Sequence, residues 1–264
     1  MPSIIVRFFQ FILIFVTIST HAADVSIQPY YYYFDYEEFD DSNNRLNNET
    51  GYIPGIQLSA SNEILPFLEA RVSTDYSNNE IDYQGHTQAG TPHTTATKQT
   101  FKNIAISILH TISYQDLSIK PLIEFQRRKW LRAIQAKGNV SSLTEHYRWD
   151  EWSFGLELSY PLWLGKVNLS TKKLLTRNGD LRIDILDPSP VVELGNGDGV
   201  AIELAYEYPI TLQQSVSLTV FYKEWHFSKG KPETINTPRG LISIYEPRST
   251  SETNGVSVTY QYAI

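Results

Sequence analysis

Two sets of residues have types and spacing that could perform acid–base or metal chemistry. Glu224 and His226 lie two positions apart, so a β-strand would place both on one face. A carboxylate that orients a histidine can make it a general base. His86 and His93 share a Gly- and Thr-rich segment, but no carboxylate pair with metal-ligand spacing accompanies them. We interpret this second set as part of a solvated loop, and we expect no metal or other cofactor.

Basic side chains are densest in residues 127–132, whose sequence is Arg-Arg-Lys-Trp-Leu-Arg. In a strand this run divides between the two faces, with Arg128 and Arg132 on one side and Arg127 and Lys129 on the other. Arginine and lysine at the outer rim of a membrane protein suit the phosphates of lipopolysaccharide, which makes that lipid a candidate partner of the second pair.

The elements that carry these groups are β-strands. In residues 152–160, 200–208 and 256–264, apolar side chains alternate with small or polar ones, the period of two that only a strand presents. Several apolar faces have aliphatic centres and aromatic ends, which matches a lipid-facing band between aromatic girdles. In the register of Val216 to Val220, Glu224 and His226 face outward, so we do not expect them to be catalytic.

The opposite face of these strands combines small residues with charges of both signs. A crowded, narrow lumen favours this mixture, whereas a soluble sandwich would bury an apolar face. We predict a network of charges inside the barrel, with Glu124, Glu157 or Tyr147 as partners of Arg128 and Arg132. The predicted lumen charges are Glu69, Arg71, Lys120, Glu124, Arg128, Glu157, Lys172, Glu203 and Glu207.

Ten strands are predicted, and the connections between them alternate in length. The expected strands are residues 25–38, 51–61, 64–78, 98–113, 117–135, 144–162, 165–177, 197–208, 214–228 and 252–263. The long connections are residues 39–50, 79–97, 136–143, 178–196 and 229–251. Alternation places every short turn at one end, which is periplasmic in outer-membrane barrels. The predicted fold is therefore all-β, a transmembrane up-and-down antiparallel barrel, with a soluble sandwich or lipocalin-like barrel as the alternative.

The N-terminus has the composition of a signal peptide. Arg7 precedes an apolar run over residues 8–18, which is too short for a spanning helix and is followed by small residues ending at Ala23. We expect cleavage after Ala22, leaving residues 23–264 as one barrel domain in the outer membrane of a Gram-negative cell. The sequence contains no cysteine, and its net charge of −7 gives no reason to expect nucleic acid.

The strand count, the rhythm of the connections and the length of the mature part resemble the omptins, a family of ten-stranded outer-membrane proteases. The resemblance is architectural and spans most of the mature chain. It implies an acidic pair near the second outer loop, where this chain has Glu80 and Asp82, and an Asp-x-His pair on a later loop. There the chain has Asp184 and Asp187 but no histidine within residues 177–199. Without that base the resemblance predicts the fold and not the activity.

The predicted function is accordingly a non-enzymatic outer-membrane barrel with a structural or surface-interaction role. Small barrels can fill their interiors with side chains, so we expect a polar and largely closed lumen. The alternatives are an omptin-like protease and a narrow substrate-selective channel. The expected partners are outer-membrane lipid, lipopolysaccharide and the outer-membrane assembly machinery, and we expect a monomer. The chain ends at Ile264 rather than at the aromatic residue that is usual for barrels of this type.

Overall fold

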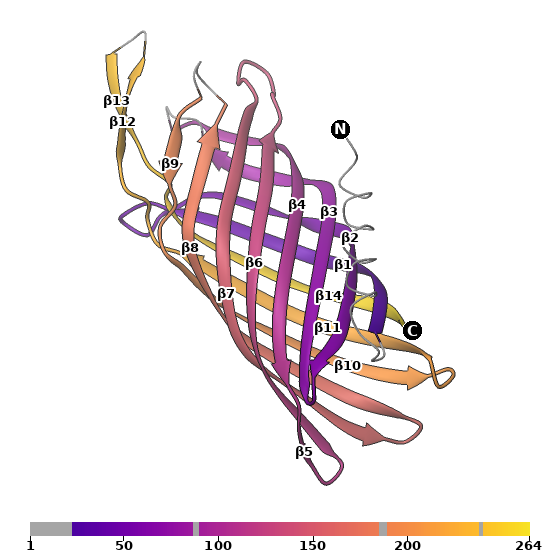
Figure 1. Cartoon of the computed structure of the whole chain (residues 1–264). Helices are drawn as coiled ribbons and strands as arrows, with labels where there is room; N and C mark the ends of the chain where they lie inside the picture. The colour runs from indigo at the N-terminus through magenta and orange to yellow at the C-terminus, as the bar shows by residue number, and fades with distance from the viewer. Residues whose placement is uncertain (1–22, 87–89, 185–188, 238–239) are drawn as a thin grey trace, which may run out of the picture.

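The computed structural model describes residues 23–86, 90–184, 189–237 and 240–264, and the predicted signal peptide lies outside these residues. The described chain is all-β and forms a closed barrel of ten antiparallel strands, as predicted (Figure 1). The barrel strands are β1 Ala23–Phe39, β2 Arg45–Leu65, β3 Leu68–His86, β4 Pro92–His110, β6 Leu117–Ile134, β7 Leu143–Leu162, β8 Gly165–Ile183, β10 Gly197–Pro209, β11 Gln214–Phe227 and β14 Arg248–Ala263.

Each barrel strand pairs with its neighbour in the chain, and β1 closes the barrel against β14. Closure removes the unpaired strand edges that a membrane would not tolerate. The described chain also has four short strands in addition to the ten of the barrel: β5 Ile112–Tyr114, β9 Val191–Glu193, β12 Glu233–Thr237 and β13 Gly240–Ile244. β12 and β13 pair with each other as a hairpin that projects beyond the outer end of the barrel (Figure 1).

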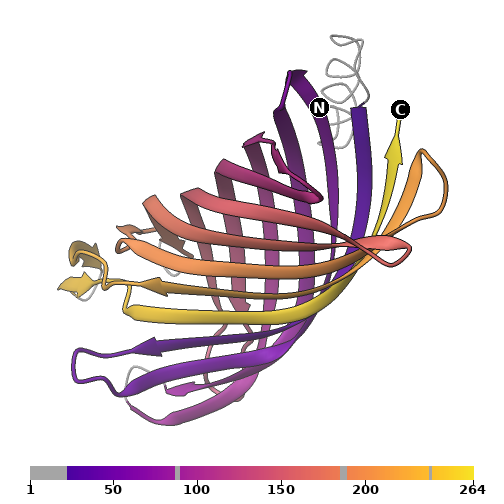
Figure 2. The same cartoon turned by 90° about the horizontal axis from the view of Figure 1, so that it is seen from below.

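Both ends of the described chain lie at the end of the barrel that carries the short turns. The backbone N–H of Ile264 donates to the Ala23 carbonyl at 2.8 Å. Seen from below, the start of β1 and the end of β14 lie side by side (Figure 2). Among the described residues, no helix has the length and apolarity that a membrane crossing needs.

The half of the barrel nearest the short turns is apolar on its outer surface. Leu218, Val220, Val256 and Val258 are exposed there on adjacent strands, and Leu218 lies directly opposite Val258. Further exposed side chains continue this band around the barrel: Ile27, Ile56, Ile104, Ile106, Ile123, Phe154, Ile202 and Leu204. Aromatic pairs such as Tyr31 with Tyr52 and Phe125 with Trp152 mark the band's upper edge. This surface has the pattern of a lipid-facing band with a girdle.

Toward the long loops the pattern reverses. On β3, Ile81 and Tyr83 face inward and are buried, whereas the neighbouring Asp82 and Gln84 are exposed. This end of the barrel therefore buries many aromatic and aliphatic side chains and has a polar exterior. Its core contains Tyr32, Phe34, Tyr36, Ile53, Ile81, Trp130, Tyr147, Trp149, Leu181 and Val192.

The reversal corrects the predicted boundaries of two loops. We expected loops at residues 39–50 and 79–97, but half of the first segment belongs to β2 and most of the second belongs to β3 and β4. Polar residues such as Asn48 and Gln84 pair in the ladder and lie on its outer face. An apolar outer face does not mark these parts of the strands, because their outer face is polar.

Candidate functional site in the barrel lumen

The half of the lumen nearest the short turns holds a polar cavity of about 370 Å³, which we call the inner cavity. A network of ion pairs lies on its wall. Arg71 bonds Glu69 and Glu157, with its Nη1 2.8 Å from the Glu157 carboxylate, and Lys120 donates to Glu69 at 2.8 Å. Lys166 and Glu207, which also line this cavity, approach to 3.1 Å. Asp24, near the start of β1, and Gln261, near the end of β14, also line the cavity, so it reaches the short-turn end.

The structure places all nine predicted lumen charges on cavity walls, eight on this inner cavity and Arg128 on a second cavity above it. Lys172 donates to Glu124 at 3.1 Å, and Glu203 lies at the boundary because it lines both cavities. The partners expected for Arg128 were wrong. Its Nε lies 3.3 Å from Glu151, a buried acid on the same face of β7 as Glu157.

A second buried network closes the outer end of the lumen. Arg132 on β6 contacts three carboxylates, with Nη1 2.7 Å from both Glu38 and Glu145, and it also contacts Glu49. Its Nη1 lies 3.5 Å from the Tyr147 hydroxyl, the one expected partner that is found. Arg132 and these acids are almost completely buried. We call this group the outer plug: Arg132, Glu38, Glu49, Glu145, Tyr36, Trp130 and Tyr147.

The alternation that placed Glu157 in the lumen also puts Glu145 and Glu151 there, so this signal was present in the sequence. Of the aromatic members of the plug, Tyr147 was expected as a partner of the inward arginines. Tyr36 and Trp130 were harder to find, because aromatic residues in barrel strands are usually assigned to the outer girdles. Here Tyr36 and Trp130 meet edge to face at 5.0 Å, and Trp130 stacks on Tyr147 at 4.4 Å.

The connection from β13 to β14 supplies a fourth carboxylate to the plug. Tyr147 donates its hydroxyl proton to Glu246 at 3.0 Å, and the Tyr36 hydroxyl lies 3.5 Å away. Burial, reinforced by the charges of Glu38 and Glu145, raises the pKa of Glu246 well above its usual range, although Arg132 opposes the shift. The protonated form of Glu246 is therefore favoured in the folded protein.

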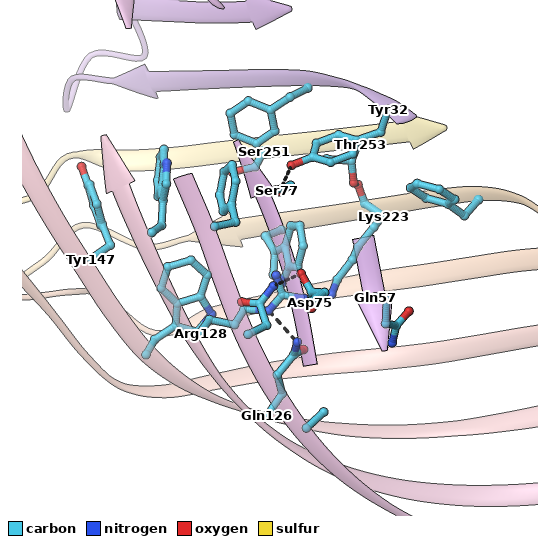
Figure 3. A pocket seen from close by; sticks show the side chains of 18 of the residues that line it. Tyr32, Gln57, Asp75, Ser77, Gln126, Arg128, Tyr147, Lys223, Ser251 and Thr253 are labelled. Carbon is cyan, nitrogen blue, oxygen red and sulfur yellow. Dashed lines mark hydrogen bonds between the residues drawn. The ribbon is translucent and has the colours of Figure 1, made fainter. Parts of the chain in front are cut away.

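Below the plug lies the second cavity, of about 210 Å³, which we call the upper cavity (Figure 3). Its walls are rich in aromatic rings, among them Tyr32, Phe101, Trp149 and Trp225. Arg128 and Lys223 both lie against the Trp225 ring, 4.5 and 4.1 Å from its centroid. Labelled side chains from several strands converge on this space in Figure 3. The upper and inner cavities adjoin, because Gln28, Gln57, Ser73, Glu124, Lys172 and Glu203 line both.

The acidic pair suggested by the omptin resemblance does not face the lumen. Glu80 and Asp82 are exposed on the outer face of β3, on either side of the buried Ile81. Glu80 accepts a hydrogen bond from Gln135. The two carboxylates therefore cannot act on a substrate held inside the barrel mouth.

A histidine partner for Asp184 comes from another strand. His146 Nε2 on β7 lies 2.8 Å from Asp184, and Ser189 donates to the same carboxylate at 2.9 Å. These hydrogen bonds, led by that from His146, lower the pKa of Asp184. The serine bonds the aspartate rather than the histidine, so this trio lacks the nucleophile–base contact of a hydrolytic triad. Asp187 lies outside the described residues.

The remaining candidates are also at the periphery. Glu224 and His226 contact each other on the outward face of β11, as their register predicted. The His86 ring contacts the Leu46 carbonyl at 3.3 Å. Arg127 is exposed and pairs with Asp150 at 2.7 Å. Within the described ranges, no group of three or more histidine, cysteine, aspartate or glutamate side chains could hold a metal ion.

Comparison by sequence finds no matching family model, and no curated protein matches either. Comparison by structure does find matches. The outer-membrane protease OmpT from Escherichia coli superimposes with a TM-score of 0.66 at 8% identity, over 92% of this chain and 96% of OmpT. The translocator domain of the autotransporter NalP from Neisseria meningitidis gives 0.45 at 8% identity, over 97% and 95% of the two chains. The fold is thus an outer-membrane-type barrel, and its architecture is omptin-like.

Proposed function

We propose that this chain is a bacterial outer-membrane protein without hydrolytic activity, which presents its outer loops and the β12–β13 hairpin at the cell surface. The observation that carries this proposal is the outer plug. Arg132 and the aromatic rings around it occupy the mouth of the barrel, where an enzyme that cleaves external substrates would need an open groove.

Placement in the outer membrane is supported by the exposed apolar band and by the closed ladder of backbone hydrogen bonds. Cations lie just above this band on the outer surface. Arg127 pairs with Asp150 there, and the Lys102 ammonium lies over the Tyr76 ring. These groups are suited to lipopolysaccharide phosphates, which are the lipid partner we propose.

The proposal excludes peptide hydrolysis, and this is our first prediction. Refolded full-length protein incubated with lipopolysaccharide and fluorogenic dibasic peptides should release no more fluorophore than protein-free controls. Asp82→Ala and His146→Ala variants, which alter the two exposed acid–base candidates, should behave identically. Cleavage by the wild-type protein that disappears in either variant would establish a protease instead.

A further inference from the structure

The two cavities of the lumen differ in the side chains that line them. No aromatic residue of the described chain lines the inner cavity, whereas aromatic rings face the upper cavity from several strands. Tyr32 on β1 lies across the barrel from Trp149 on β7, and Phe101 on β4 lies across from Trp225 on β11. A space with aromatic walls therefore lies between the polar inner cavity and the plug.

This space is large enough for a molecule bigger than water. Its volume is about 210 Å³, and an apolar cavity of roughly 150 Å³ holds a benzene molecule. Protein interiors otherwise contain few voids larger than a water molecule. Water between aromatic faces finds few hydrogen-bond partners, whereas a flat apolar body gains stacking and dispersion contacts. The walls therefore favour an aromatic ring as the body of a ligand.

The charged groups around the upper cavity nearly balance, so they select neither an anion nor a cation. Apart from Glu246, whose protonated form is favoured, the charged lining residues are Arg128, Lys172, Lys223, Asp75, Glu124 and Glu203. Glu151 is buried behind this wall and approaches both Arg128 and Lys223. Three cations therefore face four carboxylates. An ion of either sign would lose its hydration and approach groups of its own charge, so the walls favour an uncharged ligand.

A free acceptor and a free donor lie among these groups. Asp75 accepts from Asn103 at 2.7 Å and from Tyr30 at 3.2 Å, both through Oδ1, and its Oδ2 accepts no hydrogen bond within the described part of the chain. The Lys223 ammonium makes no hydrogen bond among the described residues, and its nearest carboxylate oxygen, on Glu151, is 3.7 Å away. Asp75 and Lys223 both line the upper cavity (Figure 3). A hydroxyl group suits this pair, because it both donates and accepts while it remains uncharged.

We propose that the upper cavity binds a small uncharged phenol. Its ring packs among the aromatic walls, and its hydroxyl donates to Asp75 Oδ2 and accepts from Lys223. A phenol keeps its proton near neutral pH, as tyrosine does. The ligand reaches this site through the inner cavity, because Glu124, Lys172 and Glu203 line both cavities while the plug fills the outer end. The site depends on the fold alone and would exist whether or not the barrel hydrolyses peptides.

The test is calorimetric titration of the refolded full-length barrel with 2-naphthol, using empty micelles of the same detergent as the blank. We expect saturable binding of one molecule per chain. The anion 2-naphthoate and the cation 2-(aminomethyl)naphthalene have the same ring system, and each should bind at least about tenfold more weakly, because its charge must be desolvated. Absence of saturable 2-naphthol binding, or equal or tighter binding of either ion, would overturn the proposal.

Two matched substitutions locate the ring of the ligand. Ala105 lines the upper cavity, and Ala205 lines the inner cavity. Ala105→Phe fills space that the ligand needs and should weaken 2-naphthol binding at least about tenfold. Ala205→Phe adds the same ring to the inner cavity and should leave the affinity at equilibrium within about twofold. Unchanged affinity in a folded Ala105→Phe variant, or an equal loss in Ala205→Phe, would place the ligand elsewhere and refute the proposed site.

A second comparison tests the hydroxyl group. 2-Methoxynaphthalene lacks the proton that the hydroxyl donates, and it should bind the wild type about fivefold more weakly than 2-naphthol. In Asp75→Asn this preference should fall to within about twofold, because Asn103 and Tyr30 hold the amide oxygen and leave the amide nitrogen, a donor, facing the ligand. A preference that persists unchanged in Asp75→Asn would contradict the proposed hydrogen bond.

Heat-modifiable migration on gels establishes that each variant is folded. If Ala105→Phe does not fold, Asp75→Asn and the comparison of 2-naphthol with the two ions still decide the matter.

Discussion

At the scale of single residues, Arg132 is the group on which the outer end of the barrel depends. It compensates the charges of Glu38, Glu49 and Glu145, all of which are buried. A buried ion pair contributes little net stability, because desolvation offsets the attraction between its charges. Removing one partner is nevertheless costly, since the other charge stays buried without compensation.

We therefore predict that Arg132→Met destabilises the barrel by about 3–5 kcal/mol. The measurement is urea unfolding of the refolded protein in detergent, followed by tryptophan fluorescence. Arg45→Met is the matched control, because Arg45 pairs with Glu37 at 2.6 Å on the exposed surface and should contribute less than about 1 kcal/mol. Equal effects of the two substitutions would show that the buried network is not a stabilising unit.

A second prediction at this scale concerns pH. The raised pKa of Glu246 means that the folded protein keeps this carboxyl protonated at pH values where the unfolded chain, with a pKa near 4.5, has lost the proton. The folded state therefore binds more protons in that window, so its stability must fall as the pH rises above about 4.5.

Glu246→Gln mimics the protonated carboxyl and should remove this dependence. The melting temperatures of wild type and variant should be similar near pH 5, and the wild type should melt at the lower temperature near pH 8. Subtracting the two curves cancels the titrating groups that do not interact with Glu246, whereas the charges of Glu38, Glu145 and Arg132 respond to the substitution and stay in the difference. A difference that does not change with pH would contradict the assignment.

At the scale of elements, each long strand combines two patterns. The half of β2 near the short turns exposes Ile56 on the apolar outer surface, whereas the half near the long loops buries Ile53 and Glu49 in the barrel. The sequence alone predicted the barrel, the strand order and the inward charges, because small and charged residues share one face of each strand and the connections alternate in length. The plug was not predicted as a unit, since its members come from β1, β2, β6 and β7 and meet only when the barrel closes.

The same limit applies to the pair of His146 and Asp184. The omptin resemblance implies a histidine on the same loop as its aspartate, whereas the partner of Asp184 comes from the adjacent strand, because the pairing of β7 with β8 brings His146 close. Spacing along the sequence can predict contacts between residues of one strand, such as Glu224 with His226. Contacts between neighbouring strands can be predicted only when the register of their pairing is known.

A third prediction concerns the apolar band on the outer surface of the strands. Leu218→Arg places a charge on the lipid-facing surface and should destabilise the barrel by about 2–4 kcal/mol if the residue lies near the bilayer midplane. Leu241→Arg makes the same substitution in the β12–β13 hairpin, which projects beyond the barrel, and should have little effect. Folded yields in lipid vesicles, read by heat modifiability on gels, compare the two. A tolerated Leu218→Arg would mean that this surface does not face lipid.

At the scale of the whole molecule, the barrel is hollow toward the end with the short turns and packed at the end with the long loops. The two adjoining cavities leave space along the inner part of the lumen, whereas the plug fills the part near the long loops. A molecule built this way can admit small solutes from one side without connecting the two compartments. The lumen is therefore a cavity that is closed at one end rather than a continuous pore.

This asymmetry predicts the behaviour of the protein in planar bilayers. The wild type should show no stable conductance steps, because the stacked rings of Trp130 and Tyr147 close the lumen above the upper cavity. Removing both rings in a Trp130→Ala, Tyr147→Ala double variant should open the lumen and produce discrete conductance steps. Trp152→Ala removes a ring from the outer surface of β7 and should stay silent. Steady conductance in the wild type would reverse the argument, since the outer network would then be a selectivity filter in a narrow channel rather than a plug.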